Sequence, residues 1–97
     1  MNVTTKGNLY NYLYMVGYGD VALTANSVAN NNATIEATGD LIIDSKGNVG
    51  NNRGNLHALN GVLSVKGSNL NNDYGEIRGY DDVTLALTAT TTALRAR

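Results

Sequence analysis

The chain of 97 residues has no cysteine, no proline, no tryptophan and no phenylalanine, and its aromatic residues are six tyrosines. Without cysteine the sequence gives no information on redox compartment, although such a chain can be exported through a pore without disulfide complications. Its formal net charge is −1, from seven basic and eight acidic residues that are scattered along the chain. Because no basic stripe exists to neutralise phosphates, we expect no nucleic-acid partner.

Long hydrophobic runs are also missing. The apolar stretch near the N-terminus, residues 9–16, is interrupted by Asn11 and by three tyrosines. It is too short and too polar for a signal peptide or a membrane span, so we expect neither in this chain and no membrane insertion. If the parent protein is secreted, we expect its targeting segment to lie outside these residues.

What the sequence does contain is a recurrence of apolar residues. They form three series with intervals of 20 or 21 residues: Met15, Ile35, Leu56 and Ile77; Val21, Leu41, Val62 and Val83; Val28, Val49 and Leu70. A period of this size is the signature of a stacked-coil protein. Within a unit the apolar segments are short and are bounded by glycine, asparagine or serine, which is typical of strands separated by turns.

The sequence therefore predicts an all-β fold, a parallel β-helix (β-solenoid) of about four turns with 20–21 residues each. No window of the chain has the apolar spacing of a long amphipathic helix. Equivalent residues of successive turns should lie one strand spacing apart, about 4.8 Å, so the three series are the predicted structural core. We expect a right-handed coil, because parallel crossovers have that hand.

A pair of asparagines follows each member of the third apolar series, at positions 30–31, 51–52 and 71–72. Asparagines at the same corner of successive turns can form a ladder, in which each amide donates to one neighbour and accepts from the other. We predict such a ladder at Asn31, Asn52 and Asn72. Plain turn chemistry is the alternative, since asparagine tolerates the left-handed backbone of a sharp corner.

The chain divides into three predicted parts. Residues 1–14 form a lead-in strand or N-terminal cap, residues 15–88 carry the solenoid repeats, and residues 89–97 form a partial turn or a frayed tail. The last part lacks both an asparagine pair and the next apolar anchor.

Three tyrosines of the lead-in, Tyr10, Tyr12 and Tyr14, alternate with other residues in the period-two pattern of a strand. Such a row could stack sugars or hold a partner protein. We favour a structural role in which these rings cover the open core of the first turn, because a terminal turn needs cover and tyrosine combines an apolar ring with a polar tip.

Candidate catalytic and metal-binding residues are few. Glu36, His57 and Arg78 each follow an apolar anchor by one position, so they should lie outward and adjacent. We interpret them as a surface charge ladder and not as an acid–base site, because an open sheet face offers no cleft.

Three aspartates, Asp20, Asp40 and Asp82, precede apolar anchors, but the fourth equivalent is Gly61. The gap separates Asp40 from Asp82 by two turns, about 10 Å, which is too far to share a calcium ion. We interpret these aspartates as turn caps. The sequence thus predicts no catalytic residue, no metal site and no cofactor.

The units resemble a known repeat. In one unit, Gly39 and Asp40 precede a short apolar alternation, Val49 and the asparagine pair follow, and Gly54 opens a segment of the form Gly-x-apolar-x-small. Over residues 15–87 this pattern is similar to the haemagglutinin-type repeat of the filamentous haemagglutinin and contact-dependent inhibition exoproteins, which are exported by two-partner secretion. The first unit carries Ala33 where the next carries Gly54, so its corner could differ.

This resemblance implies a right-handed parallel β-helix that is secreted or held at a bacterial cell surface. The expected function is a non-catalytic stalk for adhesion or for delivery of a C-terminal toxin, and hence a role in virulence. Expected partners are adjacent repeats of a longer parent or other copies of the chain, and a host surface or glycan receptor. The alternative is a self-assembling binding module that forms homo-oligomers or filaments through open β edges.

Overall fold

The computed structural model describes residues 1–88, which form thirteen strands and no helix. No helix in that part of the chain is long and apolar enough to cross a membrane. The strands are β1 (Asn2–Thr4), β2 (Asn8–Tyr10), β3 (Tyr14–Gly17), β4 (Val21–Ala25), β5 (Ser27–Ala29), β6 (Thr34–Ala37), β7 (Leu41–Ser45), β8 (Val49–Gly50), β9 (Asn55–Ala58), β10 (Val62–Gly67), β11 (Leu70–Asn71), β12 (Glu76–Gly79) and β13 (Asp82–Leu87).

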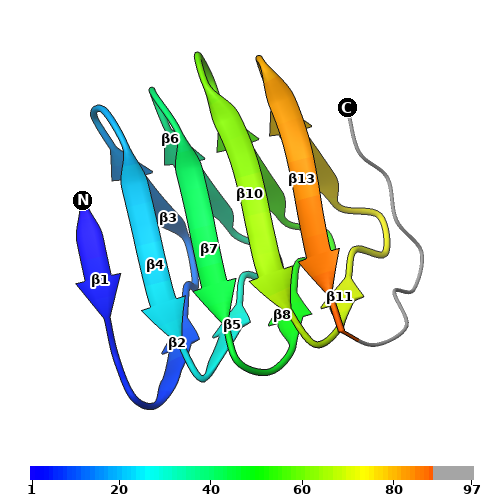
Figure 1. Cartoon of the computed structure of the whole chain (residues 1–97). Coiled ribbons are helices and arrows are strands. Elements are labelled where there is room, and N and C mark those ends of the chain that lie inside the picture. Colours follow the sequence, from blue (N-terminus) through cyan, green and yellow to red (C-terminus); the bar gives the residue numbers. More distant parts are fainter. Residues whose placement is uncertain (89–97) are drawn as a thin grey trace.

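Three sheets run along the molecule, in the orders β1-β4-β7-β10-β13, β11-β8-β5-β2 and β12-β9-β6-β3 (Figure 1). The strand pairs are parallel, and neighbours in a sheet are three elements apart in the sequence. The chain therefore completes one coil between neighbouring strands. Four coils are complete, and β13 opens a fifth. The predicted parallel β-solenoid of about four turns is confirmed.

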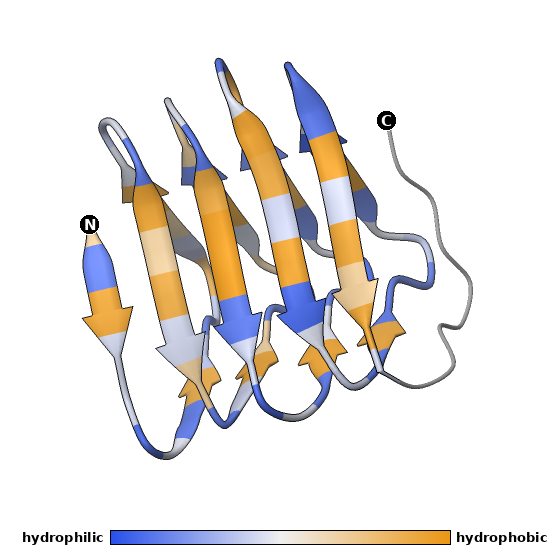
Figure 2. Cartoon of the chain, viewed as in Figure 1, coloured by the Kyte–Doolittle hydropathy of each residue, from blue (hydrophilic) through white to orange (hydrophobic). Residues whose placement is uncertain are grey.

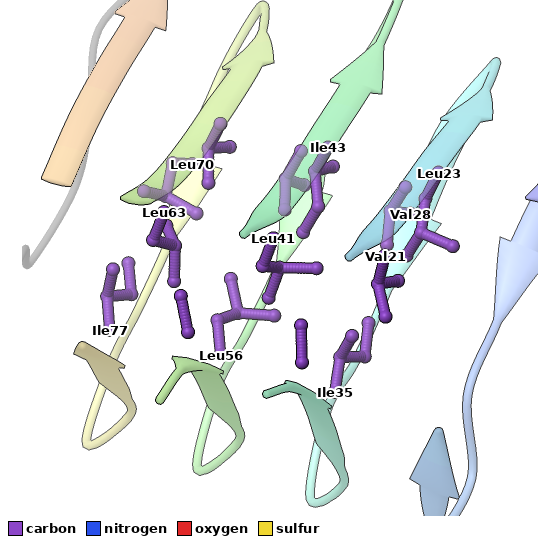
Figure 3. Close-up of a cluster of buried hydrophobic side chains, with 14 of the residues drawn as sticks. Val21, Leu23, Val28, Ile35, Leu41, Ile43, Leu56, Leu63, Leu70 and Ile77 are labelled. Carbon is purple, nitrogen blue, oxygen red and sulfur yellow. The ribbon is translucent and has the colours of Figure 1, made fainter. Parts of the chain in front are cut away.

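Two of the three predicted core columns lie in the expected register: Met15, Ile35, Leu56 and Ile77 in one sheet, and Val28, Val49 and Leu70 in another. All but Met15 are buried, and Met15 is partly buried against the core. Figure 3 shows side chains of both columns between the sheets, with Ile35, Leu56 and Ile77 of the first and Val28 and Leu70 of the second labelled, and Figure 2 shows the hydrophobic residues aligned across neighbouring strands. This stacking supplies the hydrophobic burial that one coil alone lacks.

The third predicted column, which placed Val62 in the core with Val21, Leu41 and Val83, is wrong at Val62. Leu63 pairs with both Leu41 and Val83 and is fully buried. Val62 pairs instead with Asp82 and is not part of the buried core.

An extra corner residue explains this error. Ala37 pairs with Ala58, and Leu41 pairs with Leu63. Three residues (38–40) lie between the first two positions, 37 and 41, whereas four residues (59–62) lie between their partners in the next coil, 58 and 63. Because side chains alternate between the two faces of a strand, a shift of one residue exchanges inside for outside. A constant interval therefore selects the wrong residue here.

A second inward column in the same sheet was missed. Leu23, Ile43 and Val65 pair in register and are buried, and Leu85 continues the column at β13. These strands are five or six residues long, so each presents another inward position two residues beyond the first. The repeat period alone marks only one inward position for each strand.

Residues 1–14 form a regular first coil and not a separate cap or a single lead-in strand. β1 pairs with β4, and β2 pairs with β5, in the same sheets as the later coils. The predicted continuous strand is broken at Asn11, which is buried at a corner. Val3 and Leu9 are the residues of this coil that pack on the core beside Met15. The predicted tail, residues 89–97, lies outside the described residues.

The later coils share one left-handed corner, at Asn32, Arg53 and Tyr74, where φ is 57°, 56° and 55°. A Cβ atom on Gly54, the next residue, would collide with the carbonyl oxygen of Asn30 in the preceding coil. Ala33 occupies the equivalent place in the second coil without changing the corner. It has room because the corner of the first coil is one residue shorter. Two residues lie between Asn11 and Tyr14, whereas three lie between the equivalent Asn30 and Thr34.

We predict that Leu63→Ala lowers the free energy of unfolding by about 2–5 kcal/mol, because it leaves a cavity in a fully buried column. The neighbouring substitution Val62→Ala is the matched control and should cost clearly less, since Val62 faces outward. Urea denaturation followed by circular dichroism would measure both. Equal losses for the two variants would contradict the register described here.

Candidate functional site

A buried ladder of asparagines occupies the corner that follows the sheet of β2, β5, β8 and β11. The Nδ2 atom of Asn11 donates to Oδ1 of Asn30 at 2.8 Å. Asn30 donates in the same way to Asn51 at 2.8 Å, and Asn51 donates to Asn72 at 2.7 Å. The last three side chains are fully buried, and Asn11 is 8% exposed. The ladder thus runs through all four coils.

Each inner rung also binds backbone. Asn51 Nδ2 lies 3.3 Å from the carbonyl oxygen of Gly54 in its own corner and 3.2 Å from that of Glu76 in the next coil. Asn30 makes the equivalent pair of contacts one coil earlier. A buried amide that lacked these partners would be costly, so each rung requires the next coil to be in place.

The predicted ladder of Asn31, Asn52 and Asn72 is correct only at Asn72. Asn31 is exposed, and its Oδ1 accepts the backbone N–H of Asn52 at 3.0 Å; Asn52 accepts that of Asp73 in the same way at 3.1 Å. These two residues therefore form an outer row of side-chain-to-backbone bonds, one position beyond the buried ladder. The physical reason is that the inward position lies two residues after each buried aliphatic residue. This position holds the first asparagine of the pair after Val28 and Val49, but the second asparagine after Leu70.

The aspartates at another corner act as caps, as expected. Asp20 Oδ1 accepts the backbone N–H of Asp40 at 2.9 Å, and Asp40 Oδ1 accepts that of Val62 at 2.9 Å. Asp82 accepts the N–H of its own neighbour, Val83. The first two carboxylates thus bond one coil to the next. Within residues 1–88 no group of three or more acidic or histidine side chains is arranged to hold a metal ion.

The charge ladder on the outer face of β6, β9 and β12 is confirmed in register, since Glu36 pairs with His57 and His57 with Arg78. Sequence reasoning missed Glu76, whose Oε1 lies 2.7 Å from Nε2 of His57. Its other oxygen lies 3.4 Å from the Arg78 guanidinium. The signal was present, because Glu76 precedes Arg78 by two residues and so shares its outward face.

This cluster suits cross-strand cohesion better than acid–base chemistry. The Nδ1 atom of His57 lies 3.6 Å from Glu36, and Nε2 faces Glu76, so both ring nitrogens face carboxylates of the protein. A general base needs a nitrogen within hydrogen-bond reach of the substrate proton. The two carboxylates occupy both directions that such a proton transfer would use.

The three tyrosines of the first coil do not cover its core, and that prediction is wrong. Tyr10, Tyr12 and Tyr14 are 56%, 79% and 76% exposed. Tyr10 and Tyr12 stack, with ring centroids 6.3 Å apart and planes inclined by 12°. Tyr10 and Tyr14 point outward because each is the strand neighbour of a residue that packs on the core, Leu9 or Met15.

Comparison with known families gives two matches to the haemagglutinin repeat, over residues 1–52 and 43–93. Together they span most of the chain, including the first coil, which lay outside the resemblance drawn from the sequence. Neither the curated proteins nor the solved structures that were searched gave a match.

We predict that Asn51→Ala lowers the free energy of unfolding by roughly 2–4 kcal/mol, because it removes the buried rung that accepts from Asn30 and donates to Asn72. The matched control is Asn52→Ala, which removes one exposed bond and should cost about 1 kcal/mol or less. Urea denaturation again provides the measurement. A larger loss for Asn52→Ala would show that the outer row, and not the buried ladder, holds the coils together.

Proposed function

The chain belongs to the haemagglutinin-repeat family, and from this we propose that it is a structural β-solenoid segment of a bacterial adhesin or toxin-delivery exoprotein. The haemagglutinin repeat is a structural, non-catalytic type of repeat, found generally in secreted or surface proteins of bacteria. We propose further that the parent is exported by two-partner secretion and contributes to virulence. The activity of such a parent would reside outside this segment.

The observation that carries this proposal is the bonding of every coil to the next. Each coil is joined to its neighbour through all three sheets, and the asparagine ladder adds a buried rung at each step. Separating two coils along the axis would break all of these bonds together. A rod built in this way holds its length, which is the property that a stalk requires.

Coil-by-coil bonding also fits export of an unfolded chain. Each coil finds its main partner in the coil that precedes it, about 21 residues earlier in the sequence. A segment emerging from a pore could therefore fold onto the coils already outside. The absence of cysteine means that no disulfide has to form or be broken on the way.

Both ends of the described solenoid show partly buried apolar residues. Val3 and Leu9 lie in the first coil, and Val83, Leu85 and Leu87 lie in β13. In the stalk, neighbouring coils of the parent would pack on them. This observation also favours the second candidate, a module in which other copies of the chain pack there and form homo-oligomers or filaments.

A host surface or a glycan receptor is a further proposed partner. The exposed rings of Tyr10, Tyr12 and Tyr14 support this proposal, because tyrosine offers an apolar face with a polar tip to a binding partner.

A structural stalk should accept another coil. We predict that a second copy of residues 41–62, inserted after Val62, yields a folded protein, because Val62 occupies the place that Asp40 holds before Leu41. The urea m-value should rise by roughly one fifth, in proportion to the added chain. The control insertion exchanges each inward residue of the copy with its outward neighbour and should not extend the fold. An unfolded first protein, or an unchanged m-value, would contradict the stalk.

For the self-assembling candidate we predict that the average mass in light scattering rises with concentration between the micromolar and millimolar ranges. Leu85→Lys should suppress this rise, because it places a charge on the inward side of the end strand β13. Thr84→Lys is the control, since Thr84 is exposed on the outward side of the same strand. A monomer at every concentration would remove the self-assembling candidate and leave the stalk untouched.

A further inference from the structure

An open hollow of about 480 Å³ lies on the outer face of the sheet β11-β8-β5-β2. Its volume is in the range of small-molecule sites. It lies on a different sheet from the His57 charge ladder. The residues that matter for its chemistry are Asn8, Asn26, Ser27, Ala29, Asn48 and Gly50.

The floor of the hollow is made by two residues with little or no side chain. Ala29 on β5 pairs with Gly50 on β8, and both stand in the row that begins with Tyr10 on β2. A Cβ atom on Gly50 would lie 3.1 Å from Oδ1 of Asn31, so the Asn31 amide lies close above this glycine. The Asn31 amide therefore bounds the trough at Gly50, and a side chain larger than that of Ala29 would fill the trough.

One wall of the hollow is a fixed set of amides. Asn8 Oδ1 accepts from Nδ2 of Asn26 at 3.1 Å and from Oγ of Ser27 at 2.7 Å. Two coils further on, Asn48 Oδ1 accepts from Asn69 at 3.1 Å and from Ser68 at 3.0 Å. These bonds between coils hold the carboxamides in set orientations, so a ligand would meet groups that are already ordered.

The same bonds leave polar atoms directed to the solvent. Within residues 1–88, Oδ1 of Asn26 and Nδ2 of Asn48 have no protein hydrogen-bond partner. An acceptor and a donor therefore lie together at the hollow, and no charged side chain lines it. The hydroxyl groups of a sugar both donate and accept, so they match this neutral set.

Tyr10 adds an aromatic surface at the β2 end of the trough. Its ring stands next to Ala29 in the register and is 56% exposed. The hydroxyl lies 3.3 Å from Nδ2 of Asn8, and the ring stacks on Tyr12, so its position is held from two sides. An exposed ring beside amides suits a ligand with an apolar face and polar edges, as a pyranose has.

We infer that this hollow binds a neutral oligosaccharide, with the amides of Asn26 and Asn48 on its hydroxyl groups and Tyr10 under one ring. This specifies the glycan partner and rests on that part of the proposed function, whereas the stalk does not depend on it. Anionic ligands are disfavoured because the hollow provides no cation to neutralise them.

The test is a titration of the ¹⁵N-labelled chain with three neutral probes, maltohexaose, cellohexaose and chitohexaose, up to millimolar concentration. At least one should produce saturable shifts in the side-chain amide of Asn48 and the backbone amides of Ala29 and Gly50. Ala29→Gln should weaken this binding roughly tenfold or more by filling the trough. Ala22→Gln, on the outer face of β4, is the matched control and should leave it unchanged.

Tyr10→Ala should also weaken binding, whereas Tyr80→Ala, which removes an exposed ring at another corner, should not. These two tyrosine variants test the inference if Ala29→Gln does not fold, which a loss of chemical-shift dispersion would show. The inference is overturned if no probe gives saturable shifts, if Tyr10→Ala binds as well as the original chain, or if a heparin hexasaccharide shifts the same amides equally. The coil insertion tests the stalk separately, so failure here would leave that result standing.

Discussion

The structure depends on the vertical stacking of equivalent residues in successive coils. Parallel strands at a spacing of about 4.8 Å place each inward aliphatic on its counterpart and each buried asparagine on the next. A buried carboxamide is tolerated only when its donors and its acceptor are satisfied, and in this ladder the partners come from the same corner and from the neighbouring coils. Within residues 1–88 no buried side-chain nitrogen or oxygen lacks a partner. The ladder therefore fixes the register as well as stabilising it.

The coils keep this register although their corners differ in length. The corner between Ala58 and Leu63 has one residue more than its equivalent in the preceding coil, and the corner between Val65 and Leu70 has one residue fewer. The two changes cancel, so the next strand re-enters the same column. Insertions at the corners are therefore absorbed on the surface, while the strands between them remain in place.

Such a scaffold leaves its outer faces free to differ in chemistry. The sheet of β3, β6, β9 and β12 carries the charges around His57, whereas the sheet of β2, β5, β8 and β11 carries neutral amides and small residues. Neither face contributes to the aliphatic columns, because outward side chains alternate with inward ones. Membership in the family indicates the scaffold, whereas a binding role depends on the side chains of one outer face.

The sequence alone was sufficient to predict the period, the parallel strands, two core columns and the membership in a haemagglutinin-type repeat. These features depend on spacings near 21 residues, and spacing is visible without coordinates. Only the tertiary structure decided between Val62 and Leu63, between Asn31 and Asn30, and whether Glu76 meets His57. Each choice is a matter of one residue or of contact across coils. A period known to within one residue cannot tell the two faces of a strand apart, because that same single step reverses the direction of the side chain.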